Sequence, residues 1–198
     1  MKYRTIVADP PWDVKAGPGA GGYVVDESGT QIWQQVTTPS RALPYSSMTV
    51  TEIAALPVKM LATDDAHLYL WTINKYVEDA YTVARAWGFQ PSTLLVWAKN
   101  PMGGGLGGAW GITTEYVLFA RRGSLKASGR VTGTWFNWTR PYNDRGKPKH
   151  SAKPEHFYDL VEQVSPGPYV ELFSREHHRL GWDVWGNESA NTATLETV

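Results

Sequence analysis

Cysteine is absent from the 198 residues of this sequence, which excludes a disulfide-stabilised scaffold, a cysteine-ligated zinc or iron–sulfur site, and catalysis by a thiol. Long apolar runs are absent too, because no stretch approaches the roughly 20 residues that a membrane-spanning helix needs. The apolar run before Asp9 is too short for a secretory signal peptide. These absences predict a globular cytoplasmic protein that does not enter a membrane.

Net charge is also lacking, since 19 basic residues balance 19 acidic ones, but the two signs are segregated along the chain. Nine basic residues and one acidic residue, Asp144, lie between Arg121 and Lys153, so this segment carries a net charge of +8. The aromatic residues interleaved with these charges are Trp135, Phe136, Trp138 and Tyr142. Such a mixture can contact phosphates and stack on bases, which predicts nucleic-acid binding. The basic residues expected to contact the substrate are Arg140, Arg145, Lys147 and Lys149. The alternative is a solvated loop whose aromatic side chains pack into the core.

Short apolar strands alternate with amphipathic helices along the chain. Strands are predicted at residues 3–8, 67–71, 93–97, 116–120 and 169–173. One helix is predicted after the Thr49–Glu52 capping box, a second on the stripe from Val77 to Trp87, and a third after Pro154. Residues 13–46 and 121–150 show no sustained period and are predicted to be long loops. The alternation is typical of an α/β domain with a mainly parallel sheet, which binds ligands beyond the carboxyl ends of its strands. The residues expected at such ends are Asp9, Trp71, Lys99 and Arg175.

The tetrapeptide Asp9-Pro10-Pro11-Trp12 directly follows the first predicted strand. An aromatic amine such as adenine N6 is a weak nucleophile, because its lone pair is delocalised into the ring. Two acceptors near its hydrogens, the Asp9 carboxylate and the Pro10 carbonyl, would favour a more nucleophilic nitrogen, and the two prolines would hold both acceptors in place. Trp12 could then stack on a base that has left its own stack. The alternative is a rigid turn with a core tryptophan.

An ordered set of motifs runs along the chain: Asp9-Pro-Pro-Trp12, Pro44-Tyr-Ser-Ser-Met48, Leu70-Trp-Thr-Ile-Asn74, Ala86-Trp-Gly-Phe89, Leu95-Val-Trp-Ala-Lys99, Thr114-Glu-Tyr116, Ser151-Ala-Lys-Pro-Glu155, Glu171-Leu-Phe173 and Trp185-Gly-Asn-Glu188. With this set the chain resembles the adenine-N6 methyltransferases of the 70-kDa-subunit (MT-A) type, in their bacterial or phage branch. The resemblance implies a single Rossmann-like, doubly wound sheet of the S-adenosylmethionine-dependent type, with long active-site loops. The motif order is permuted, because the catalytic motif comes first and the cofactor-binding strand last. The methyltransferase domain would span residues 1–188, followed by a polar tail at 189–198.

The same resemblance implies a role for individual residues. The catalytic pocket would be formed by Asp9, Pro10, Pro11 and Trp12. Substrate would also be contacted by Tyr45, Lys153, Trp71 and Lys99. Besides Asp9, S-adenosylmethionine would be held by Glu171, Leu172, Phe173, Arg175, His177, His178, Asn187 and Glu188. Positioning dominates such a methyl transfer, and no metal is expected.

The expected function is transfer of a methyl group from S-adenosylmethionine to adenine N6 in DNA. Three alternatives stay open: adenine methylation in RNA, cytosine-N4 methylation, and a methyltransferase-like partner subunit that binds nucleic acid without catalysis. The resemblance also allows a homodimer or a partner subunit. The Gly-rich insertion at residues 15–43 is expected to be a lid or a substrate-specific loop, whereas the glycines at 103–108 lack the following helix of a dinucleotide-binding motif.

Overall fold

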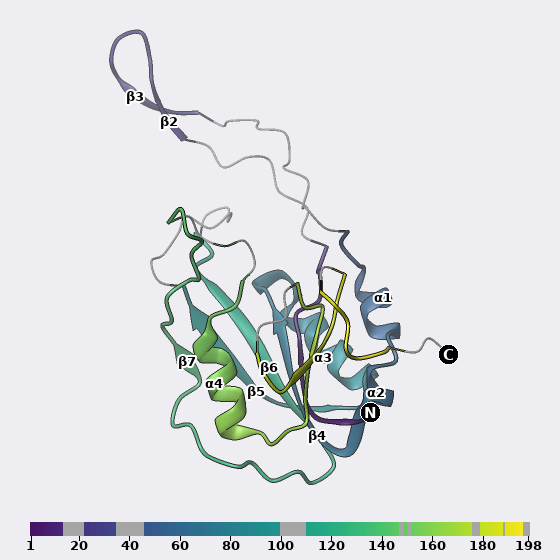
Figure 1. Ribbon diagram of the computed structural model, residues 1–198. Helices are drawn as coiled ribbons and strands as arrows, with labels where there is room; N and C mark the ends of the chain where they lie inside the picture. The colour runs from purple at the N-terminus through teal and green to yellow at the C-terminus, as the bar shows by residue number, and fades with distance from the viewer. Residues whose placement is uncertain are drawn as a thin grey trace.

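A computed structural model describes residues 1–13, 22–34, 46–99, 110–146, 149, 152–175, 179–187 and 189–195. Its centre is a seven-stranded sheet (Figure 1). In the order in which they lie side by side, the strands are β7 (Trp135–Phe136), β5 (Gln90–Ala98), β6 (Thr114–Arg122), β4 (Ala62–Thr72), β1 (Tyr3–Ala8), β8 (Tyr169–Leu172) and β9 (Trp182–Trp185). The predicted α/β architecture is therefore confirmed.

Six of the strands run in one direction, and β6 runs against its neighbours β4 and β5. The mainly parallel sheet is as predicted, but the reversed strand is not. The end of β5 lies beside the start of β6, since the Lys99 amide donates to the Thr113 carbonyl at 2.9 Å. As a consequence, the start of β6 lies at the same edge as the carboxyl ends of the other strands.

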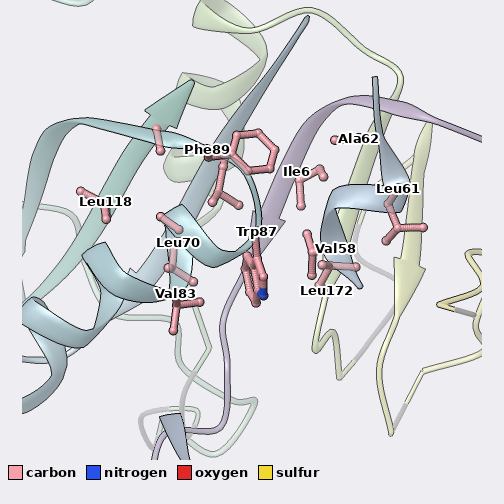
Figure 2. Packing of buried hydrophobic residues seen from close by; sticks show 14 of the residues in the cluster. Ile6, Val58, Leu61, Ala62, Leu70, Val83, Trp87, Phe89, Leu118 and Leu172 are labelled. Carbon is pink, nitrogen blue, oxygen red and sulfur yellow. The ribbon is translucent and has the colours of Figure 1, made fainter. Parts of the chain in front are cut away.

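Helices cover both faces of the sheet (Figure 1). One face is covered by α1 (Val50–Ala55), α2 (Val58–Leu61), the 3-10 helix η1 (Asn74–Tyr76) and α3 (Val77–Ala86). The other is covered by α4 (Glu155–Val164). Alternating residues of the central strands β1 and β4 enter two separate cores, so that Leu70 of β4 packs on the first face and Trp71 on the second. Figure 2 shows the first core, where Trp87 from the end of α3 lies among strand residues such as Ile6.

Local sequence signals fix the ends of these helices. Thr49 and Glu52 form the predicted capping box at the start of α1. After α3 the chain turns at Gly88, whose φ of +82° is in the left-handed region that favours glycine. Pro154 immediately precedes α4, as predicted. No helix among the described residues is long and apolar enough to cross a membrane.

Four strands lie in segments where no strand was predicted. In the predicted loop 13–46, β2 (Gly22–Val25) and β3 (Gln31–Gln34) pair as an antiparallel hairpin that projects from the sheet (Figure 1). The two-residue β7 lies within the second predicted loop, and β9 follows the last predicted strand. In the predicted polar tail, the Ala193 amide donates to the Val184 carbonyl of β9 at 3.1 Å, and Ala193 is buried. The division of the chain at residue 188 remains a prediction.

Candidate active site

The Asp9-Pro10-Pro11-Trp12 turn begins where β1 ends, between β4 and β8. The Asp9 amide donates to the Leu172 carbonyl at the end of β8, at 3.3 Å. The Trp12 amide donates to the Pro10 carbonyl at 2.8 Å, and the Met48 amide donates to the Pro11 carbonyl at 2.8 Å. Backbone hydrogen bonds from both sides thus add to the restriction that the two prolines impose on the turn. A carbonyl oxygen has two lone pairs, so Pro10 can still accept a further hydrogen bond.

Trp12 is part of the core, which corrects the expectation that it stacks on a substrate base. Its indole is 4% exposed and stacks on Tyr76 with the ring centroids 5.2 Å apart. The indole Nε1 donates to the Trp71 carbonyl at 3.0 Å. In this conformation Trp12 joins the catalytic turn to the end of β4, and both faces needed for base stacking are covered. The alternative interpretation, a rigid turn with a core tryptophan, is the correct one for this side chain.

Four charged side chains form an alternating chain of ion pairs along the carboxyl edge. Lys153 Nζ lies 2.9 Å from Asp9 Oδ2 and 3.1 Å from Glu115 Oε2. The other oxygen of Glu115, Oε1, lies 2.5 Å from Lys99 Nζ. The four residues come from the end of β1, the segment before α4, the start of β6 and the segment after β5. The sheet topology therefore gathers residues that are far apart in sequence into one electroneutral network, here called the ion chain (Asp9, Lys153, Glu115, Lys99).

Burial and the neighbouring charges shift the pKa values of Asp9, Glu115 and Lys153. Burial raises the pKa of Asp9, and the positive charges of Lys153 and Arg175 oppose that increase. Burial would also raise the pKa of Glu115, but Lys153 and Lys99 outweigh it and lower that pKa to about 2. Burial acts to lower the pKa of Lys153, but the two carboxylates beside it raise this pKa above its ordinary value. At neutral pH Glu115 and Lys153 are therefore charged, and Asp9 is a better proton acceptor than an exposed aspartate.

The buried Trp71 ring lies against Lys153 of this network. Its side chain is 1% exposed, and Lys153 Nζ lies 4.7 Å from the centroid of its ring. A cation over an indole face is electrostatically favourable. Among the described residues, the Trp71 Nε1 has no hydrogen-bond partner. The burial of Trp71 against Lys153 corrects the predicted substrate contact by Trp71. Lys99 is paired with Glu115, and its contact with substrate stays a prediction.

A tight turn after β8 forms the neighbouring part of the edge. Glu171, which is 8% exposed, accepts hydrogen bonds from the Tyr158 hydroxyl at 2.7 Å and the Ser174 hydroxyl at 3.3 Å. Phe173 adopts a φ of +65°, which is unusual for a residue other than glycine and stores strain of a kind common at ligand sites. The Ser174 amide donates to the Trp185 carbonyl at 3.1 Å, and a Cβ at Gly186 would lie 1.9 Å from the Ser174 carbonyl oxygen. The turn is therefore fixed by close backbone packing against the end of β9.

The predicted cofactor residues occupy different positions around this turn. Arg175 follows it and acts electrostatically on Asp9, while Asn187 is exposed just after β9. The Leu172 side chain is fully buried in the core, so any contact of this residue with the cofactor would come from its backbone. Five predicted site residues lie outside the described part of the chain: Tyr45, Lys147, His177, His178 and Glu188.

The basic segment divides into a buried and an exposed part. Phe136 and Trp138 stack on one another at 4.4 Å and pack against the α4 core, as the alternative interpretation predicted. Trp135 and Tyr142 are 61% and 39% exposed. Arg145 and Lys149 are exposed and Arg140 is half-buried. The exposed residues of the segment thus form an aromatic and basic surface. Lys153, the last basic residue of the segment, is not part of this surface, because it belongs to the ion chain.

The chain is similar in sequence to known proteins over nearly its whole length, including the sheet and its carboxyl edge. Residues 3–188 match the sequence profile of the MT-A70 family. The chain belongs to the MT-A70 family. It is 26% identical over 193 residues to the Type II methyltransferase M.MunI of Mycoplasma sp, a match that covers 94% of this chain and 78% of that protein.

Eukaryotic members of the family are also similar to the chain. It is 23% identical over 209 residues to human N(6)-adenosine-methyltransferase catalytic subunit METTL3, and 24% identical over 209 residues to an MT-A70-like protein of Drosophila melanogaster. Each match covers 94% of this chain but only 28% and 27% of those proteins. The chain thus spans about a quarter of the length of these eukaryotic relatives.

Sequence reasoning missed Glu115 as a site residue. Glu115 belongs to the Thr114-Glu-Tyr116 motif of the resemblance and lies at the start of β6, before five uncharged residues. Its place at the catalytic edge depends on the reversed direction of β6. Without that direction, the start of a strand in a parallel sheet is expected at the opposite edge, so the available signal was incomplete.

Proposed function

We propose that this MT-A70 methyltransferase transfers a methyl group from S-adenosylmethionine to the N6 amino group of adenine in DNA. The observation that supports this best is the anchored Asp9-Pro10 turn, which carries a carboxylate and a carbonyl acceptor at the carboxyl edge of the sheet. A pair of pre-positioned acceptors suits an exocyclic amine that must become more nucleophilic and then lose a proton.

The residues at this edge fit S-adenosylmethionine. Asp9 and Glu171 are acidic side chains at the ends of the adjacent strands β1 and β8, and a sulfonium carries a positive charge. We propose that Asp9, Glu171, Phe173, Arg175 and Asn187 hold the cofactor. When bound, it supplies an electrophilic methyl group.

In this proposal the chain's own residues orient the amino group, take up its proton and hold the accepting carboxylate in place. Asp9 and the Pro10 carbonyl accept hydrogen bonds from the amino group and orient it, and Asp9 then takes up the proton that N6 releases. Lys153, 2.9 Å from Asp9 Oδ2, fixes the orientation of the carboxylate. Glu115 and the ring of Trp71 hold Lys153 in turn. Because burial raises the pKa of Asp9, proton transfer to it is easier than to an exposed aspartate.

DNA is the proposed substrate because the Type II methyltransferase M.MunI matches over 78% of its own length. RNA is the second candidate, since the chain also resembles proteins named N(6)-adenosine-methyltransferases. The exposed surface with Trp135, Tyr142, Arg145 and Lys149 is proposed to contact the polynucleotide, with the aromatic rings stacking on bases.

The test supplies methyl-labelled S-adenosylmethionine together with single-stranded DNA, double-stranded DNA or RNA, and identifies labelled nucleosides after digestion. We expect N6-methyladenine from DNA, and a loss of about 10²-fold or more in Asp9→Asn, as for removal of a general acid–base group. The matched control is Asp13→Asn, which changes an aspartate on the same segment whose carboxylate accepts a hydrogen bond from Ser47. Label on RNA alone would favour the second candidate. No label on any polymer, or equal activity in Asp9→Asn, would overturn the proposal.

A further inference from the structure

The connection from β8 to β9 is unusually short for a link between parallel strands. It runs from Phe173 to Gly181, nine residues, and returns the chain from the carboxyl end of β8 to the start of β9. Parallel strands are usually joined by a dozen or more residues that include a helix packed on the sheet. No helix occurs in the described part of this connection, residues 173–175 and 179–181. Its position must therefore depend on other contacts.

Arg179 supplies such contacts to α4. Its Nε and Nη2 lie 2.7 Å from Oε1 and Oε2 of Glu162, which makes a two-pronged pair with one carboxylate. The same Nη2 lies 2.7 Å from Asp159, and Nη1 lies 3.8 Å from Glu155. Glu162 also accepts a hydrogen bond from the Trp182 Nε1 at 2.7 Å. One arginine and one glutamate thus attach both the connection and the start of β9 to the same helix.

Helix α4 is tied to the catalytic edge at two further points. Tyr158, in the middle of α4, donates its hydroxyl hydrogen bond to Glu171 on β8. Lys153, just before α4, pairs with Asp9. The connection held by Arg179 begins with the strained Phe173 turn, and Arg175 on it acts electrostatically on Asp9. The turn also packs on Trp185 and Gly186 at the end of β9, so a shift of β9 relative to α4 would change where this turn lies relative to Asp9.

From these contacts we infer that Arg179 is a positioning residue, which holds the start of β9 against α4 and thereby sets the affinity of the site for S-adenosylmethionine. This inference rests on the proposed function for the identity of the cofactor. Arg179 itself contacts carboxylates of α4 and none of the reacting groups. Its loss should weaken cofactor binding and leave the chemical step of the bound complex nearly unchanged.

The test compares Arg179→Ala, Arg179→Lys and the control Arg122→Ala in the full chain. Arg122 is a suitable control because it also joins two elements, donating to the Lys59 carbonyl at 2.8 Å. It lies at the end of β6, on the side of the sheet opposite to the catalytic carboxyl edge. Calorimetry measures binding of S-adenosylhomocysteine, and steady-state assays measure KM for S-adenosylmethionine and kcat. Hydrogen–deuterium exchange on the free chain measures protection of the peptide covering residues 172–185.

In Arg179→Ala we expect binding weakened about tenfold or more, KM raised by a similar factor and kcat within about threefold of the unchanged protein, as for loss of charge-assisted hydrogen bonds that only position. Exchange in the 172–185 peptide should be faster. Arg179→Lys should recover part of the affinity, because lysine keeps the charge but not the planar fork. Arg122→Ala should alter neither quantity. Where Arg179→Ala does not fold, Glu162→Gln provides the same comparison.

Unchanged affinity and unchanged exchange in Arg179→Ala would overturn the inference. So would a loss of kcat with no change in KM, or an equal loss of affinity in Arg122→Ala. Failure of the unchanged protein to bind S-adenosylhomocysteine would instead count against the proposed cofactor, so the two outcomes are distinguishable.

Discussion

Glu115 offers the most direct test of the ion chain, because it touches both lysines and contacts no substrate in the proposed mechanism. Glu115→Gln keeps the size of the side chain and its ability to accept a hydrogen bond but removes its charge. Lys99 then loses its ion pair, and Lys153 retains Asp9 as its ionic partner among the described residues. The variant therefore measures how much the charge of Glu115 contributes to the stability of the fold.

The magnitude follows from the pKa of Glu115. A carboxyl whose pKa falls from 4.5 to about 2 on folding stabilises the folded protein at neutral pH by about 3 kcal/mol. A carboxyl with a lowered pKa stabilises the protein fully above its unfolded pKa, and this stabilisation is lost as the pH falls through the folded value. The contribution of Glu115 is therefore complete above pH 4.5 and disappears toward pH 2. Asp9 contributes with the opposite sign, and because the charge of Glu115 helps to raise the pKa of Asp9, that pKa is lower in Glu115→Gln.

Urea denaturation followed by tryptophan fluorescence at pH 7, 4 and 3 provides the assay. We expect Glu115→Gln to lower the free energy of unfolding by about 3 kcal/mol at pH 7, with a smaller difference at pH 4 and the smallest at pH 3. The control Glu78→Gln, at an exposed position in the first turn of α3, should change stability by less than about 0.5 kcal/mol. A difference that stays constant from pH 7 to pH 3 would show that packing, not charge, is lost, and would refute the reasoning.

Two further predictions concern the exposed basic surface and the turn after β8. The first variant replaces three residues by alanine: Arg140, Arg145 and Lys149. We expect weaker DNA binding and a shallower dependence of log Kd on log salt than in a control variant, because contacts with phosphates release counterions. The control replaces three basic residues near the opposite edge of the sheet: Lys2, Arg4 and Lys59. Equal salt slopes in the two variants would contradict the prediction. Gly186→Ala should lower the free energy of unfolding by about 2 kcal/mol or more, because its Cβ would lie 1.9 Å from the Ser174 carbonyl oxygen. Gly133→Ala, with its nearest atom at 4.0 Å, is the control, and thermal unfolding at the same midpoint for both would refute the packing argument.

Much of the fold could be predicted because its signals are local. The strand from Tyr3 to Ala8 ends where Asp9-Pro10 makes further strand pairing unfavourable, and the predicted and observed bounds agree. The Thr49–Glu52 capping box and Gly88 act within a few residues of the helix ends that they fix. Asp9 could be placed at the carboxyl edge for the same reason, since it follows a strand directly.

Other features depend on contacts between distant segments, which no local pattern records. The direction of β6 determines that Glu115 joins Lys153, 38 residues later in the chain. Tryptophan is a residue type that often stacks on bases, but Trp12 is held in the core by its contacts with Tyr76 and the Trp71 carbonyl. The attachment of Arg179 to α4 depends on the helix and the connection lying side by side, although Arg179 looks like an ordinary surface residue in the sequence.

The ion chain also explains how a catalytic carboxylate can be anchored and remain accessible at the same time. The exposed fractions of its side chains are 9% for Lys153, 15% for Glu115, 17% for Lys99 and 28% for Asp9. Burying a charge is costly unless it is paired, and here each inner charge has a partner on both sides. Asp9 lies at one end of the chain, so it receives an ammonium partner from one direction and keeps the largest exposed fraction of the four. A carboxylate in the middle of such a network, like Glu115, would be held equally well but would have both oxygens occupied. The terminal position thus leaves Asp9 suited to accept a substrate hydrogen, and Glu115 suited to hold the lysine that orients it.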